Sequence, residues 1–122
     1  MTEELNKNIP EYINIPEDFN IPEDIINEII ETTDTLVLLV FINPECSKCM
    51  LFEPTFNQVI PNYKDKLKVI KVDSSKDPDL VRYYSIKDFP AMLLLYNGIE
   101  LNYKVGVVND SELINFINEE FC

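Results

Sequence analysis

Residues 36–49, LVLLVFINPECSKC, decide the fold, because a strand-forming run leads straight into two closely spaced cysteines. The run Leu36–Ile42 is continuously apolar, which is typical of a central strand that is buried on both faces of a parallel sheet. Cys46 and Cys49 follow it at the start of an expected helix over residues 46–63. Residues three apart on a helix share one face, with Cβ atoms about 5–6 Å apart, so these two thiols can form a disulfide after a small adjustment.

The position of the cysteine pair also predicts its acid–base chemistry. The free amide groups and the dipole of a helix N-terminus stabilise a thiolate, so we expect the pKa of Cys46 to lie below the usual value of about 8.5. We expect Lys48 to lower this pKa further and Glu45 to oppose that effect. Cys49 lies deeper in the first turn and is the expected resolving thiol.

The rest of the chain surrounds this segment with alternating helices and strands. An alternating half followed by a hairpin predicts an α/β protein, with a mixed central sheet and helices on both faces. We expect the helix over 78–84 to be capped by Asp77. The expected helices cover residues 22–32, 46–63, 78–84 and 110–120, and the expected strands cover residues 36–42, 67–72, 92–96 and 101–105.

The N-terminus contains a six-residue repeat whose three copies begin at Asn8, Asn14 and Asn20. A proline in every copy prevents one continuous helix. We therefore predict an N-terminal arm over residues 1–21, packed through its isoleucines and Phe19, followed by an α/β domain over residues 22–122. The stretch Tyr12–Ile15 could pair as an edge strand in this arm, and a partner-binding motif is the alternative interpretation of the repeat.

Composition excludes several classes of function. The chain has 122 residues, 22 acidic and 10 basic, with a net charge of −12. Such a surface repels nucleic acid and anionic membranes and favours basic partners at low salt. No apolar run reaches the length of a membrane span, and the N-terminus lacks the pattern of a signal peptide. We expect a monomeric cytoplasmic protein with no nucleic-acid or membrane partner.

Cysteine and histidine counts argue against a metal site. A structural zinc site takes four Cys or His ligands, and this chain has three cysteines and no histidine. We therefore expect no metal and no other cofactor. Cys122, the last residue, is interpreted as a terminal thiol without a role, with an intermolecular disulfide as the alternative.

The chain resembles the thioredoxin family over residues 12–121, and the joint spacing of several motifs carries this resemblance. It implies a thioredoxin fold, disulfide-containing protein substrates and a reductase as electron donor. It also implies that Pro90 is the family's cis-proline, which lies against the active-site disulfide and, with Phe89, binds substrate backbone. The matching positions are Cys46, Cys49, Pro54, Val72-Asp73, Phe89-Pro90, Asn97-Gly98 and Gly106.

Other positions depart from the family pattern. Glu45 replaces the tryptophan before the first cysteine, and Ser47–Lys48 replaces glycine-proline between the two. Val40 stands where the family has a buried aspartate that assists proton transfer, and its lysine partner is aligned with Val69. If both charges are missing, deprotonation of Cys49 relies on water or on the departing thiolate.

The predicted function is thiol–disulfide oxidoreduction by dithiol exchange on protein disulfides through Cys46 and Cys49. Ser47–Lys48 should make the couple more oxidising than that of thioredoxin, with a potential between about −270 and −180 mV. The alternative is a thioredoxin-fold binding or redox-sensing module with little reductase activity. Glutathione-dependent chemistry is a weaker third possibility, because no Gly-Gly-x-Asp-like site follows the strand after Pro90.

Overall fold

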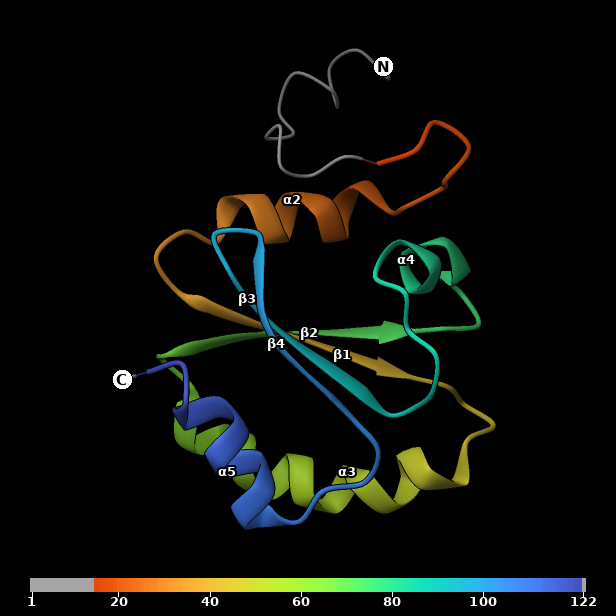
Figure 1. Ribbon diagram of the computed structural model, residues 1–122. Helices are drawn as coiled ribbons and strands as arrows, with labels where there is room; N and C mark the ends of the chain where they lie inside the picture. The colour runs from red at the N-terminus through yellow and green to blue at the C-terminus, as the bar shows by residue number, and fades with distance from the viewer. Residues whose placement is uncertain (1–14, 122) are drawn as a thin grey trace.

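The computed structural model describes residues 15–121, in which two pairs of helices enclose a four-stranded sheet (Figure 1). Most of the expected elements form within one or two residues of their predicted bounds. The elements are α2 Glu23–Glu31, β1 Leu36–Ile42, α3 Ser47–Val59, the 3₁₀ helix η1 Ile60–Tyr63, β2 Leu67–Asp73, α4 Pro78–Tyr83, β3 Ala91–Tyr96, β4 Ile99–Val105 and α5 Asp110–Asn118.

The sheet has the strand order β2-β1-β3-β4, so β1 is an inner strand. It pairs parallel with β2 and antiparallel with β3, and β3 continues antiparallel into β4. Residues Val37 to Phe41 of β1 are at most 1% exposed, which fits an apolar run that is covered on both faces. This mixed sheet with helices on both faces confirms the predicted fold class.

Alternate residues of β1 divide the core into two layers, because successive strand side chains point to opposite faces. Val37, Leu39 and Phe41 pack with the layer under α2 and α4. Leu36, Leu38 and Val40 pack with the layer under α3 and α5. The second layer includes Phe52, Phe56, Leu113, Phe116 and Ile117, and it holds the helix that begins after Cys46 against the sheet.

The helical stretch expected over 46–63 forms, but its last turn is not α-helical. The α-helix ends at Val59, and residues Ile60–Tyr63 form a 3₁₀ turn that contains Pro61. Proline has no N–H to bond to the carbonyl four residues earlier, so the α-helical pattern cannot continue unchanged through this point.

The predicted side-chain cap at Asp77 is also wrong. Asp77 occupies the N-cap position of α4, yet its carboxylate makes no capping hydrogen bond. Its φ of −124° and ψ of 60° lie outside the extended conformation from which a capping side chain usually reaches the first-turn amides. Its backbone carbonyl accepts the N–H of Leu80 at 3.2 Å instead.

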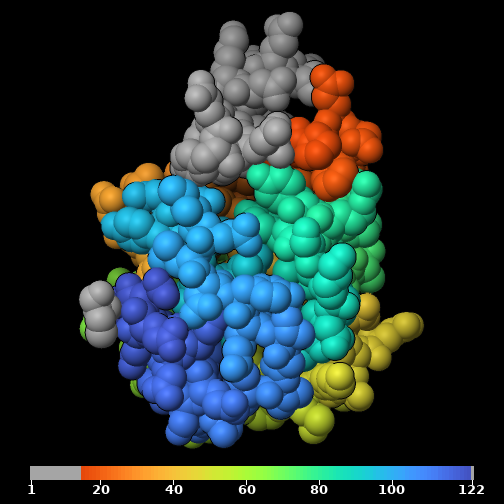
Figure 2. Space-filling view, viewed as in Figure 1, coloured from red at the N-terminus to blue at the C-terminus, as the bar shows by residue number. Residues whose placement is uncertain are grey.

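The described part of the N-terminal arm packs on the layer under α2 and α4. Ile15 and Phe19 contact this layer, as predicted for Phe19, and Ile21 is 9% exposed within it. The Arg82 guanidinium lies 4.2 Å from the centre of the Phe19 ring, and Figure 2 shows the orange-red segment against the α4 region. Residues 12–14 of the predicted edge strand lie outside the described residues, and the boundary at residue 22 stays a prediction.

Candidate active site

A tight turn after β1 places Cys46 at the N-terminus of α3. The Cys46 N–H donates to the Asn43 carbonyl at 3.0 Å, and the Glu45 N–H donates to Asn43 Oδ1, also at 3.0 Å. Asparagine and proline favour such a turn, because one supplies a local acceptor and the other restricts φ. Cys46 is the N-cap of α3, with φ −95° and ψ 112°.

The Cys46 sulfur lies among hydrogen-bond donors that favour its thiolate. Its Sγ accepts the Cys49 backbone N–H at 3.3 Å. A hydrogen bond from the Cys49 thiol is the largest cause that lowers the pKa of Cys46, burial opposes it, and the backbone amides of Cys49 and Lys48 lower it further. The half-buried Cys46 therefore combines a stabilised thiolate with access from solvent.

Cys49 has the opposite environment. It is 8% exposed, and burial raises the pKa of its thiol to about 11, with the hydrogen bond to Cys46 adding to the effect. A backbone hydrogen bond from Asn43 lowers this pKa without reversing the shift. The two thiols therefore differ in acidity, with Cys46 the stronger acid.

The loop before β3 brings Phe89 and Pro90 to the same place. The Phe89–Pro90 peptide bond is cis, Pro90 is buried, and Phe89 is half-buried. The Cys46 thiol donates to the Phe89 carbonyl at 3.7 Å. The Pro90 carbonyl accepts the Gly106 N–H at 2.8 Å, and the φ of +100° at Gly106 is one that favours glycine.

Lys48 and Asp88 connect two segments. These are the cysteine loop, residues 43–49, which includes the first residues of α3, and the proline loop, residues 84–90 before β3. Lys48 Nζ lies 3.8 Å from Asp88 Oδ2, and the Phe89 N–H donates to Asp88 Oδ1 at 2.8 Å. The Lys48 ammonium is therefore shared with a carboxylate rather than directed at Cys46 alone. Glu45 is exposed, and the tuning roles predicted for Lys48 and Glu45 stay predictions.

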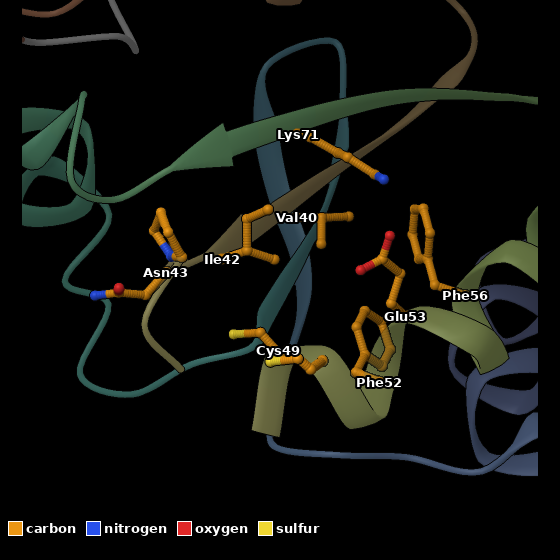
Figure 3. A pocket seen from close by; sticks show the side chains of 10 residues that line it. Val40, Ile42, Asn43, Cys49, Phe52, Glu53, Phe56 and Lys71 are labelled. Atoms are coloured by element: carbon orange, nitrogen blue, oxygen red, sulfur yellow. The ribbon is translucent and has the colours of Figure 1, made fainter. Parts of the chain in front are cut away.

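A pocket of about 160 Å³ lies on the inner side of Cys49, between α3 and the ends of β1 and β2. Val40 and Phe52 form part of its apolar wall, whereas Glu53 and Lys71 point into it from opposite sides (Figure 3). Lys71 Nζ also lies 5.1 Å from the centre of the Phe56 ring. Charged groups therefore remain close to the resolving thiol.

The predicted apolar replacement of the lysine at Val69 is wrong. Val40 pairs across the sheet with Lys71, and Val69 pairs with Leu38. The aspartate position is apolar, as expected, but a lysine is retained opposite it, where it reaches the exposed end of the pocket. A two-residue error in register is easy to make from sequence, because it leaves every side chain on the same face of the strand.

The comparison with known families covers nearly the whole described part of the chain. The sequence model of the thioredoxin family, described as "Thioredoxin", matches residues 19–119. The chain belongs to the thioredoxin family. This thioredoxin-family protein is therefore a thiol–disulfide oxidoreductase, and the geometry around Cys46 and Cys49 is the arrangement that such chemistry requires.

Named thioredoxins and solved structures resemble this thioredoxin-family chain over most of its length. Thioredoxin of Griffithsia pacifica is 32% identical over 83 residues, covering 68% of this chain and 76% of the relative. Thioredoxin of Buchnera aphidicola subsp. Schizaphis graminum is 32% identical over 104 residues, covering 76% and 96%. A structure of thioredoxin-2, described as a component of malaria parasite protein secretion machinery, has a TM-score of 0.66 at 28% identity, covering 70% of this chain and 82% of that one.

Metal-ligand clusters and membrane-spanning helices are both absent from the described part of this thioredoxin-family protein. Within residues 15–121, no group of three or more His, Cys, Asp and Glu side chains is placed to hold a metal ion. Over the same range, no helix has the length and apolar character needed to cross a bilayer.

The interpretation of the sequence missed Asn43 and Asp88. Asn43 could have been found from its place before a proline at the end of a strand, where asparagine commonly forms turns. Asp88 is one of 22 acidic residues, and its importance depends on a contact with Lys48, forty positions earlier. Nothing local in the sequence distinguishes it from a solvated surface charge.

Proposed function

We propose that this protein catalyses dithiol–disulfide exchange on protein disulfides, with Cys46 as the attacking thiol and Cys49 as the resolving thiol. A reductase restores the dithiol form after each turnover. Pro90 and Phe89 bind the backbone of the substrate next to its disulfide. The observation that carries the proposal is the Cys46 sulfur itself, which accepts the Cys49 N–H at 3.3 Å and lies 3.7 Å from the Phe89 carbonyl beside the cis-proline.

The proposed reaction transfers two electrons in two steps. The Cys46 thiolate attacks one sulfur of the substrate disulfide, and the other sulfur leaves as a thiolate that takes up a proton. Cys49 then loses its proton to water or to the departing thiolate and attacks the Cys46 sulfur. The second substrate sulfur leaves, so the substrate becomes a dithiol and Cys46–Cys49 becomes a disulfide.

The unequal acid strengths of the two thiols support this order of events. A thiolate is the nucleophile in exchange, and its lowered pKa makes Cys46 the better attacking group at neutral pH. Cys49, with a pKa of about 11, stays protonated until the mixed disulfide has formed. The pKa of Cys49 must fall at that stage, since formation of the mixed disulfide removes the negative charge on Cys46.

We also propose that the protein is monomeric and works in a reducing, cytoplasmic compartment. A closely spaced pair of free cysteines in an acidic chain is typical of that setting. The outer strand β4 carries a register irregularity opposite Leu94 and Leu95, and the Tyr103 N–H donates to Asn102 Oδ1 at 2.9 Å. Bulges and locally satisfied amides oppose edge-to-edge pairing of two copies.

The test is the reduction potential of the Cys46–Cys49 couple, measured with Cys122→Ser against graded dithiothreitol and glutathione buffers. We expect a reversible two-electron transition between about −270 and −180 mV, together with reduction of insulin when dithiothreitol supplies electrons. Cys46→Ser should abolish both. Cys49→Ser should keep the first attack and accumulate a mixed disulfide with insulin, visible on a non-reducing gel.

The same experiment separates catalysis from the alternative of a binding or redox-sensing module. If the protein were only a binding module, dithiothreitol would reduce insulin no faster in its presence than in its absence. A redox sensor would show the reversible transition but no reduction of insulin. Either result would contradict the proposed exchange on protein disulfides.

A further inference from the structure

We propose that Asp88 is a positioning residue that restrains Cys46, by holding the Lys48 ammonium and by orienting the Phe89 peptide against the Cys46 sulfur. The inference deepens the proposed function and rests on it for its catalytic meaning. Asp88 makes no hydrogen bond to either sulfur and acts through its two neighbours and through its charge. It therefore sets how reactive the attacking thiol is, without taking part in the exchange.

Both carboxylate oxygens of Asp88 are engaged, each with a different loop. Oδ1 accepts the Phe89 N–H at 2.8 Å, and the carbonyl of the same residue accepts the Cys46 thiol at 3.7 Å. Oδ2 lies 3.8 Å from Lys48 Nζ, which belongs to the segment between the two cysteines. One side chain thus contacts the segment between the cysteines and the peptide whose carbonyl faces the Cys46 sulfur.

The charge of Asp88 opposes the thiolate that the helix N-terminus favours. Its Coulombic effect raises the pKa of Cys46 and also that of Cys49. A carboxylate close to a thiolate disfavours the charged form, whereas a free ammonium would favour it. Because the Asp88 carboxylate lies 3.8 Å from the Lys48 ammonium, the cation expected to activate Cys46 is shared with a partner that also acts against the thiolate.

The other charged groups near the sulfurs do not form this bridge. Glu45 is exposed beside Cys46, and Glu53 and Lys71 lie around the pocket on the inner side of Cys49. Among Glu45, Glu53 and Asp88, it is Asp88 that contacts both Lys48 and the Phe89 N–H. Exposed ion pairs are weak in water, so the effect on thiol acidity should be moderate and should shrink as salt is added.

The test is Asp88→Asn in the reduced protein with Cys122→Ser, because asparagine keeps an oxygen that can accept the Phe89 N–H. The readout is the pH dependence of thiolate absorbance and of iodoacetamide alkylation at Cys46. We expect the Cys46 transition to move to lower pH, with about a threefold rise in the thiolate fraction below the transition. The redox couple should become more oxidising in parallel, since a stabilised thiolate favours the dithiol form.

Three further variants give the experiment its controls. Lys48→Gln should move the Cys46 transition to higher pH, and the double variant with Asp88→Asn should return close to the starting protein. Glu31→Gln removes the same charge from the far end of α2 and should leave the transition unchanged. Thermal unfolding of each variant checks that the fold is retained.

Asp88→Asn indistinguishable from Glu31→Gln would overturn the inference, and so would shifts of the same sign for Asp88→Asn and Lys48→Gln. Both readouts of thiol acidity use reduced protein without a disulfide substrate. Failure of the proposed function, seen as no reversible couple or no insulin reduction, therefore remains distinguishable from failure of this inference.

Discussion

At the scale of single residues, the site depends on the different environments of two cysteines that are three positions apart. Cys46 ends an extended segment and receives hydrogen bonds, whereas Cys49 lies inside the first helical turn with 8% of its surface exposed. Cys46 is therefore suited to be the nucleophile, and Cys49 is suited to be the resolving thiol that stays protonated at first. This division comes from backbone position, because the two side chains are chemically identical.

This difference predicts selective alkylation of the reduced protein. A thiolate forms above the thiol pKa, so iodoacetamide should label Cys46 first near neutral pH, and labelling of Cys49 should begin only as the pH approaches its pKa of about 11. Peptide mass spectrometry of the Cys122→Ser protein after short exposures measures both sites. Labelling in 8 M urea is the control and should remove the difference, since about equal pKa values are expected for two unfolded cysteines. Faster labelling of Cys49 in the folded protein would refute the assignment of roles.

The residues that carry local signals were predictable, and those that depend on distant contacts were not. The spacing of Cys46 and Cys49 at a strand-to-helix junction predicted their proximity, and the resemblance pointed to Pro90. By contrast, the contact of Asp88 with Lys48 depends on how two loops meet. The position of Lys71 opposite Val40 depends on parallel strand register, which a connection through a helix leaves open to two-residue errors.

At the scale of elements, α5 packs beside α3, the helix that begins at the active-site cysteines. Leu113, Phe116 and Ile117 of α5 pack in the same layer as Phe52 and Phe56 of α3. α5 begins with a capping box, in which Asn109 Oδ1 accepts the Glu112 N–H and Glu112 Oε1 accepts the Asn109 N–H, both at 2.9 Å. The capping box therefore stabilises the start of α5, which belongs to the core layer against which α3 packs.

Asn109→Ala should lower the free energy of unfolding by about 1 kcal/mol, because it leaves a first-turn amide of α5 without its side-chain acceptor. Urea unfolding followed by circular dichroism measures the loss. Glu112→Gln is the matched variant and should cost less, since glutamine can also accept the Asn109 N–H. A loss for Glu112→Gln as large as that for Asn109→Ala would argue that charge at the helix N-terminus, rather than the capping bond, is what matters.

The hydrophobic pattern of the sequence predicted which helices and strands form better than it predicted where they end. The run Leu36–Ile42 was predicted with the bounds that the structure has, because a continuous apolar run allows few alternatives. The end of α3 was missed, since Pro54 lies inside the helix and Pro61 lies in the 3₁₀ turn that follows it. Two prolines in one helical pattern therefore have different outcomes, since α3 continues through Pro54 and has ended before Pro61.

At the scale of the whole molecule, the two layers of helices leave the site at one end of the sheet. The turn from β1 into α3 and the loop into β3 meet there because β1 and β3 run antiparallel, which places the end of β1 beside the start of β3. The helical layers carry most of the apolar contacts, and the site itself adds only short turns and a proline loop. The acidic side chains of residues 15–121 stay outside both layers, since Ser74 is the one polar residue found buried in that range.

The central place of β1 has a consequence for amide hydrogen exchange. β1 is bonded to strands on both sides and is at most 1% exposed from Val37 to Phe41, so its amides should exchange only when the whole domain opens. Mass spectrometry or NMR in D₂O should find these amides among the slowest, with the outer strand β4 exchanging sooner. β1 amides that exchange as fast as those of β4 would contradict this order. The loop that carries Cys46 follows directly from β1, so we expect the dithiol site to persist for as long as the molecule itself stays folded.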